Sequence, residues 1–141
     1  VKRANFVAFY NDTSATNPNA VARSLHAFYE PVILISGGRD RNMDYSIMGP
    51  HIRQKVKNVI LVGEAKEKMN RMIGDFTETF LVGTYEEAVL FAYQKARSGD
   101  VILLSSGCEP TDQFATDAEK STFYKDLVNQ ITQPRRQTIV I

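Results

Sequence analysis

Short apolar runs alternate along the chain with amphipathic stretches. Five of these runs are rich in β-branched or aromatic residues and predict strands, and three are continuously apolar, as in strands covered on both faces. The predicted strands cover residues 5–10, 31–36, 57–63, 77–83 and 100–106, and a final edge strand is expected at 136–141.

The stretches between these runs have helical spacing. Asn17 and Pro18 are typical of an N-cap and a first helical position, while Thr84 and Gly99 predict the start and stop of a later helix. The predicted helices cover residues 17–29, 48–56, 64–73, 84–99 and 118–131. Strands that alternate with helices in this way predict an α/β fold of three layers, Rossmann-like, with a mostly parallel sheet of about six strands and helices on both faces.

Composition adds limits to this fold prediction. The 141 residues are enough for a buried core, and we expect residues 1–141 to form one domain. A net charge of +1 gives no reason to expect nucleic acid as a partner, and the apolar runs are too short to span a membrane. A single cysteine, Cys108, leaves no internal disulfide and is typical of a reducing cytoplasm. Because the chain starts at Val1 rather than Met, we expect a fragment of a longer protein, although removal of a tag would leave the same start.

Three polar loops follow predicted strands: NDTSATN, SGGRDRNMDYS and SSGCEPTDQFATD. The carboxyl ends of parallel strands meet at one edge of a sheet, where helix N-termini offer free N–H groups and ligands bind. Three such loops on one rim predict a ligand site.

Each loop also has a purely structural interpretation. Asn11 and Asp12 could form a turn while Asn17 caps the helix, although one cap does not require the further polar groups of Asp12 and Thr16. A carboxylate here could bind a ribose diol or orient a cation, and hydroxyls could hold a carboxylate or a phosphate.

The second loop has the same two interpretations. Gly37-Gly38 could be a simple turn with solvated charges, or a bend that aims Arg39 or Arg41 into the rim, where a guanidinium pairs with a carboxylate. The chain has no dinucleotide fingerprint and no GxxxxGK[ST] phosphate loop.

Nucleophilic and metal chemistry find little support. Cys108 lacks an evident base, so a buried, inert thiol is the favoured interpretation. His26 and His51 fall on predicted helices as ordinary helix residues, and no spacing indicates zinc. The residues by themselves predict a ligand-binding α/β domain without a complete catalytic apparatus.

Four collinear segments together resemble the C-terminal domain of the Mur ligase family. FYNDTSATNPNAVARSL is similar to a family strand followed by N-D-S-K-A-T-N and a helix, and PVILISGGRDRNMDYS to its apolar strand and Gly-Gly turn. VKNVILVGEAKEKM and DVILLSSGCEPTDQF resemble the next strand with its Gly-Glu-Ala helix start and the motif L-L-S-P-(A/G)-C-A-S-x-D-Q-F. The likeness is greatest to the branch that adds D-glutamate to UDP-N-acetylmuramoyl-L-alanine in peptidoglycan synthesis.

The resemblance implies a bacterial, cytoplasmic, ATP-dependent ligase. In this family ATP phosphorylates the substrate carboxylate and the amine of the amino acid attacks the acyl phosphate. ATP and Mg²⁺ are held mainly by a central domain over which the C-terminal domain closes. The N-terminal and central domains are absent from these 141 residues, so the fragment alone should be inactive, with no catalytic residue of its own.

The resemblance also implies roles for individual residues. Asp12 matches an aspartate that contacts the nucleotide ribose, and Asn11 lies beside it at the nucleotide and amino-acid sites. The residues implied at the amino-acid pocket are Ser14, Thr16, Arg41, Pro110, Thr111 and Asp117.

Several of these positions depart from the family pattern. Ser14 replaces a lysine, Pro110 replaces a serine and can donate no N–H, and Asp117 stands where an aromatic residue is common. Arg41 replaces a lysine and could compensate, because a guanidinium grips a carboxylate with two hydrogen bonds. The alternatives are a ligase for another amino acid or a binding or regulatory module without catalysis. An oxidoreductase shares only the sheet type.

Overall fold

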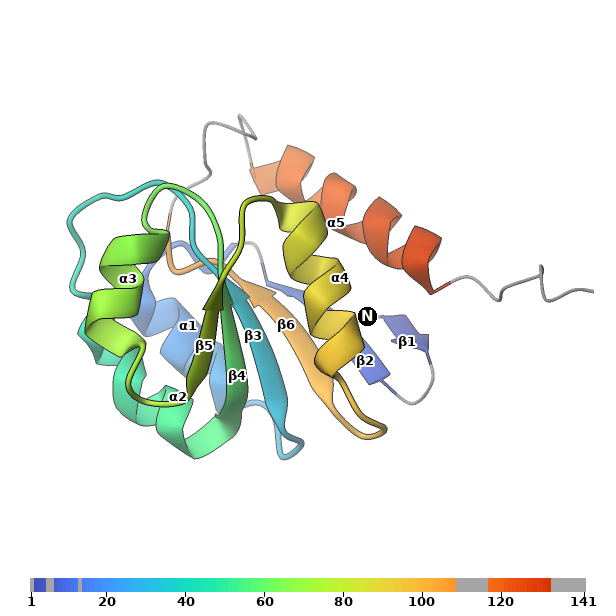
Figure 1. Ribbon diagram of the computed structural model, residues 1–141, viewed down its shortest axis with the longest axis horizontal. Helices are drawn as coiled ribbons and strands as arrows, with labels where there is room; N and C mark the ends of the chain where they lie inside the picture. The colour runs from blue at the N-terminus through green and yellow to red at the C-terminus, as the bar shows by residue number, and fades with distance from the viewer. Residues whose placement is uncertain (1, 5–6, 13, 109–116, 133–141) are drawn as a thin grey trace, which may run out of the picture.

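The structure is a computed structural model that describes residues 2–4, 7–12, 14–108 and 117–132. These residues form a six-stranded sheet with the strand order β1-β2-β6-β3-β4-β5 (Figure 1). The strands are β1 Lys2–Ala4, β2 Val7–Asp12, β3 Val32–Ser36, β4 Val56–Leu61, β5 Glu78–Leu81 and β6 Val101–Ser105. Strands β2 to β6 are mutually parallel, and β1 pairs with β2 in the antiparallel direction.

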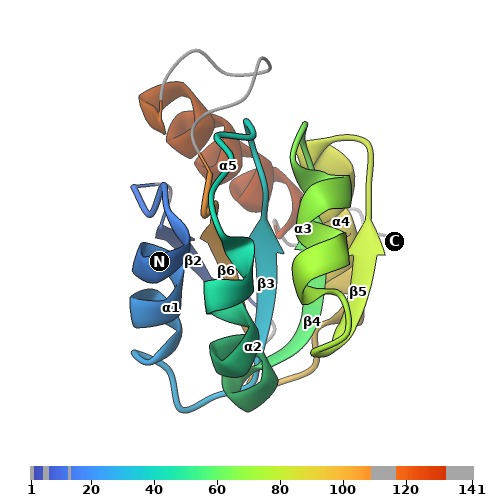
Figure 2. The same ribbon diagram turned by 90° about the vertical axis from the view of Figure 1, so that its left-hand side faces the viewer.

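The helices cover both faces of this sheet. Their bounds are α1 Pro18–Leu25, η1 Tyr45–Met48, α2 Gly49–Lys55, α3 Lys66–Ile73, α4 Tyr85–Lys95 and α5 Asp117–Ile131, η1 being a 3₁₀ turn. Helices α1, α2 and α3 lie side by side on one face (Figure 2), and α4 and α5 lie on the other. The predicted three-layer α/β fold is therefore confirmed.

The handedness of the crossovers explains which face each helix takes. The chain moves from β2 to β3, β4 and β5 in one direction across the sheet, and then α4 carries it back to β6. Since β-α-β crossovers are right-handed, a reversal of direction places the connecting helix on the opposite face. Helix α4 accordingly packs against β3 and β4 on the side opposite α1, α2 and α3.

Strands β3 and β6 form the centre of the sheet and are buried along their whole length. They run in register, with Leu34 opposite Leu103 and Ile35 opposite Leu104. Successive side chains point to opposite faces, so Leu34 joins the core under α1, α2 and α3 while Ile35 joins the core under α4 and α5. This double burial explains why the two strands read as continuous apolar runs.

The helix starts agree with the sequence, but two helix ends do not. Asn17 and Thr84 cap α1 and α4, accepting hydrogen bonds from the third residue of each first turn. Helix α1 ends at Leu25 rather than 29, because the following N–H groups turn back by three residues instead of four. Helix α4 ends at Lys95, and Gly99, with φ +94°, instead serves the turn into β6.

Two differences affect the sheet. The edge strand predicted at 136–141 lies outside the described residues, and the sixth strand observed, β1, was not predicted. Strand β2 also continues to Asp12 rather than ending at 10, since Asn11 and Asp12 keep their parallel register with Leu104 and Ser105. Within the described part of the chain, no helix has the length and apolar character needed to cross a membrane.

Candidate functional site

The three polar loops meet at one rim of the sheet, as their positions after parallel strands predicted. They follow β2, β3 and β6, which are neighbours in the order β2-β6-β3. The loops after β2 and β3 lead to helices on one face, whereas the chain after β6 leads to α5 on the other (Figure 1). Open α/β sheets bind ligands outside the carboxyl ends of their strands, at the point where the connections diverge to opposite faces in this way.

Backbone hydrogen bonds join the three loops at Ser106 and Gly107. The Gly107 N–H donates to the Ala15 carbonyl of the first loop at 2.9 Å, and the Gly37 N–H of the second donates to the Ser106 carbonyl at 2.9 Å. The Ser36 hydroxyl donates to the same Ser106 oxygen at 2.7 Å. The start of the third loop therefore fixes the positions of the other two.

Asp12 holds the first loop to the frame of the fold. Its Oδ2 accepts a hydrogen bond from the Ser105 hydroxyl at 2.8 Å and another from the Ser24 hydroxyl. Those partners lie on β6 and α1, so one half-buried carboxylate connects three elements. Sequence reasoning found Asp12 but neither hydroxyl partner.

Asn11 has a structural role of its own. Its Nδ2 donates to the Ser121 hydroxyl of α5 at 2.5 Å, which links β2 to the helix on the opposite face. Further along the loop, Ser14 is exposed and Thr16 is half-buried, so both side chains stand at the surface of the rim. The first loop therefore combines side chains used by the fold with two hydroxyl residues that are exposed or half-buried.

The second loop begins with a backbone bend that requires glycine. Gly37 has φ +123°, and a Cβ at this position would lie 1.9 Å from the Val62 carbonyl oxygen. The Tyr85 hydroxyl donates to the Gly37 carbonyl at 3.1 Å, and burial raises the pKa of this phenol well above its ordinary range. Gly37 thus makes the tight turn that both interpretations of Gly37-Gly38 require, and the Tyr85 hydroxyl of α4 holds it.

Both arginines of the second loop, Arg39 and Arg41, are exposed. The intervening Asp40 accepts hydrogen bonds from the Asn42 N–H at 2.9 Å and from the Tyr45 hydroxyl at 3.2 Å. It also forms an ion pair with Lys68 at 3.4 Å. The Asn42 N–H first of all, together with these two side chains, holds the pKa of the Asp40 carboxyl below its usual range. Asp40, which lies between Arg39 and Arg41 in the sequence, therefore stays ionised at neutral pH.

The third loop is described only at its start. Cys108 is buried, with its Sγ 3.7 Å from the Tyr45 hydroxyl and 3.7 Å from the Met69 Sδ. Its interpretation as a buried core thiol is confirmed. Pro110 and Thr111 lie outside the described residues, and Asp117 is placed only as the first residue of α5.

The two histidines were predicted as ordinary helix residues, yet they contact each other across helices. His26 follows the last turn of α1 and His51 lies in α2, with His26 Nε2 2.7 Å from His51 Nδ1. Among the residues that the structure describes, no group of three or more His, Cys, Asp or Glu side chains could hold a metal ion.

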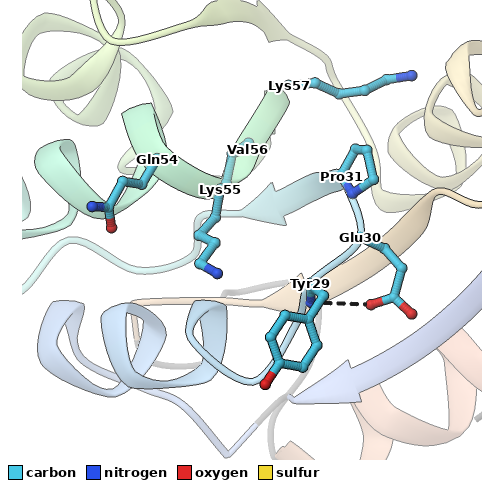
Figure 3. Close-up of a pocket in the computed structure, with 7 residues that line it drawn as sticks. All are labelled: Tyr29, Glu30, Pro31, Gln54, Lys55, Val56 and Lys57. Atoms are coloured by element: carbon cyan, nitrogen blue, oxygen red, sulfur yellow. Dashed lines mark hydrogen bonds between the residues drawn. The ribbon is translucent and has the colours of Figure 1, made fainter.

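A pocket of about 320 Å³ opens at the opposite end of the sheet, beside the amino ends of β3 and β4 (Figure 3). Lys55 and Tyr29 point toward each other there, with Nζ 5.9 Å from the ring centroid, while Lys57 points away to pair with Asp100. The lining residues are Tyr29, Glu30, Pro31, Gln54, Lys55, Val56 and Lys57. No rim loop contributes to this pocket, so its volume does not make it the candidate site.

Comparison with known proteins identifies the family of this chain. Residues 1–108 match the model of the family described as Mur ligase, glutamate ligase domain. The chain belongs to this Mur ligase family. The match covers the whole of the first and second rim loops. It ends at Cys108, which is the last residue of the third loop that the structure describes.

Individual relatives agree with this family assignment. A protein of Bdellovibrio bacteriovorus, named UDP-N-acetylmuramoylalanine–D-glutamate ligase, is 53% identical over 92% of this chain and 28% of its own length. A protein of the same name from Syntrophus aciditrophicus is 38% identical over 86% of this chain and 27% of its own length. The chain therefore spans less than a third of these relatives.

Solved structures of Mur ligases share the fold. A UDP-N-acetylmuramoyl-L-alanyl-D-glutamate–2,6-diaminopimelate ligase superimposes with a TM-score of 0.64 at 16% identity, covering 95% of this chain and 31% of that one. A ligase domain from Haemophilus ducreyi gives a TM-score of 0.57 at 14% identity, covering 89% and 95%. At such identities the likeness concerns the fold alone.

Proposed function

We propose that this chain is the C-terminal, amino-acid-binding domain of an ATP-dependent ligase that adds D-glutamate to UDP-N-acetylmuramoyl-L-alanine in bacterial peptidoglycan synthesis. The observation that carries the proposal is the relative named for this activity, 53% identical over 92% of the chain. Because the chain spans only 28% of that relative, N-terminal and central domains of a longer chain would supply the remaining machinery. We expect the complete enzyme to work in the cytoplasm and this chain alone to be inactive.

Asp12 is the residue we assign to the nucleotide. A carboxylate has about four lone-pair sites, and the two serine hydroxyls both use Oδ2, so a ribose diol at the other oxygen is compatible with the observed hydrogen bonds. Asn11 would support it by keeping β2 against α5. ATP supplies the phosphoryl group that activates the substrate carboxylate, and we propose that Mg²⁺ is bound mainly by the central domain.

Arg41 is the residue we assign to a carboxylate of the incoming amino acid. Its guanidinium can donate two parallel hydrogen bonds, which would offset the loss of the lysine that Ser14 replaces. Ser14 and Thr16, at the surface of the neighbouring loop, would add hydroxyl contacts. For Pro110, Thr111 and Asp117 the proposed place in the pocket rests on the family resemblance.

Phosphate release by the complete gene product tests this function. The assay contains ATP, Mg²⁺ and UDP-N-acetylmuramoyl-L-alanine, and compares D-glutamate with L-glutamate and a panel of other amino acids. We expect turnover with D-glutamate, and none with L-glutamate, because a pocket that grips two carboxylates also fixes the position of the amine.

Two other outcomes would contradict the proposal in different ways. Turnover with a different amino acid only would keep the ligase and replace its substrate, which would make Ser14 and Pro110 the first positions to examine. No turnover from folded protein with any amino acid would favour the binding or regulatory module.

A further inference from the structure

Lys68 of α3 contacts the second rim loop on both sides of Arg41. Its Nζ lies 3.4 Å from each carboxylate oxygen of Asp40 and 2.9 Å from the Asn42 side-chain oxygen. Arg41 therefore lies in the sequence between Asp40 and Asn42, which both contact the Lys68 ammonium. Lys68 is half-buried, although it belongs to a surface helix.

The clamped segment has a conformation that needs support. Asn42 has φ +57°, a left-handed conformation that asparagine tolerates better than most residues but that still costs free energy. The Asp40 N–H donates to Glu64 Oε1 at 3.0 Å, and the Gly38 carbonyl accepts from the Ala65 N–H at 2.9 Å. Together with Lys68, these contacts tie the loop to the start of α3 from residue 38 to residue 42.

Charge gives Lys68 a second effect. Asp40 is an anion beside two arginines, and an unpaired carboxylate there would attract the neighbouring guanidinium groups. The Lys68 ammonium and the Tyr45 hydroxyl instead occupy the Asp40 oxygens. The Lys68 ammonium thus competes with the neighbouring guanidinium groups for the Asp40 carboxylate.

We propose that Lys68 is a positioning residue that, by clamping Asp40 and Asn42, presents Arg41 to a carboxylate of the incoming amino acid. This inference rests on the proposed function, because Arg41 is assigned to the amino acid there. Lys68 itself does not touch the substrate, and its effect falls on substrate affinity rather than on the chemical step.

The test compares Lys68→Met with Lys68→Arg in the complete enzyme. Methionine keeps the aliphatic length and removes the charge, whereas arginine keeps the charge. Arg71→Met, an exposed cation one turn further along α3, is the matched control for loss of positive charge. We expect Lys68→Met to raise the KM for D-glutamate about three- to tenfold with kcat nearly unchanged, and Lys68→Arg to restore most of the affinity.

A second readout follows the loop without substrate. Trypsin cuts after arginine, so release of the clamp should speed cleavage of the Arg41–Asn42 bond about threefold or more in Lys68→Met but not in Arg71→Met. Mass spectrometry of the fragments locates the cut, and a thermal melt shows whether the fold survives.

The two readouts separate failure of the clamp from failure of the proposed function. Unchanged cleavage in Lys68→Met would overturn the clamp, whatever the kinetics. Faster cleavage with an unchanged KM would overturn the link from Lys68 to the amino acid. If the complete enzyme turns over no amino acid, the proposed function fails, and with it the role assigned to Arg41.

Discussion

The first and second rim loops place charged side chains at the same edge of the sheet but use them differently. In the first, the Asp12 carboxylate is bonded to hydroxyls of α1 and β6, and Asn11 is bonded to α5. In the second, the exposed Arg41 lies between two residues that α3 holds in place. We call side chains that connect elements of the fold, such as Asn11 and Asp12, the frame. We call the second rim loop, residues 36–46, the platform.

This difference predicts where each mutation should be felt. A change in a side chain that connects elements should lower the free energy of unfolding. A change in an exposed side chain on a fastened loop should alter ligand affinity and leave stability nearly unchanged. A frame residue without effect on stability, or an exposed side chain of the platform with a large effect on it, would contradict this division.

The largest expected loss of stability is at the bend where the platform begins. Gly37→Ala places a Cβ 1.9 Å from the Val62 carbonyl oxygen, at a φ of +123° that L-residues rarely adopt. We expect a loss of at least about 3 kcal/mol in the free energy of unfolding, measured by urea denaturation. In the control Gly83→Ala, the Cβ meets only the mobile tip of Glu87 at 3.2 Å, so the loss should stay below about 1 kcal/mol. Equal losses of stability in the two variants would show that the bend at residue 37 does not require glycine.

A smaller loss is expected at Asp12, the central residue of the frame. Asp12→Ala deletes the acceptor for two hydroxyls and should lower the free energy of unfolding by about 2 to 3 kcal/mol. Asp12→Asn keeps one acceptor oxygen and should lose less. Chemical denaturation of the three proteins checks the order, and an unchanged midpoint in Asp12→Ala would show that this carboxylate does not hold the elements together.

The smallest expected effect on stability comes from the phenols of Tyr45 and Tyr85, whose hydroxyls contact residues of the platform. It appears only at high pH. Burial raises the pKa of Tyr45 and of Tyr85, and contacts with Cys108 and Asp40 add to the shift for Tyr45. The folded protein then keeps protons that the unfolded chain loses, so stability should decline as pH rises above about 10. Ultraviolet titration should show both phenols ionising only as the fold opens. Ionisation of all six tyrosines in one step near the ordinary value would contradict this burial.

Most of the frame could be predicted from the sequence. The apolar runs of β3 and β6 indicated strands buried on both faces, and Asn17 and Thr84 marked helix starts by residue type alone. Parallel strands bring their carboxyl ends together, which is why the rim could be located before any contact was known. Local residue types were enough for these features, because strand burial and helix caps each leave a pattern in residues that are close in the sequence.

The contacts that hold the rim could not be predicted, because their partners are distant in the sequence. Ser105 lies 93 residues from Asp12, and Lys68 lies 26 residues from Asn42. Nothing in its local sequence distinguishes Lys68 from Lys66 on the same helix. Strand β1 was missed for a similar reason, since a three-residue edge strand carries almost no periodic signal.

The most direct test of this account is the KM for D-glutamate of Arg41→Ala in the complete enzyme, measured with its free energy of unfolding. We expect KM to rise at least about tenfold, the loss of about 1.4 kcal/mol of binding, while stability changes by less than about 0.5 kcal/mol. Arg71→Ala serves as the control for a lost positive charge. An unchanged KM in Arg41→Ala would contradict the account by removing Arg41 from the amino-acid site, and a large loss of stability would place it in the frame instead.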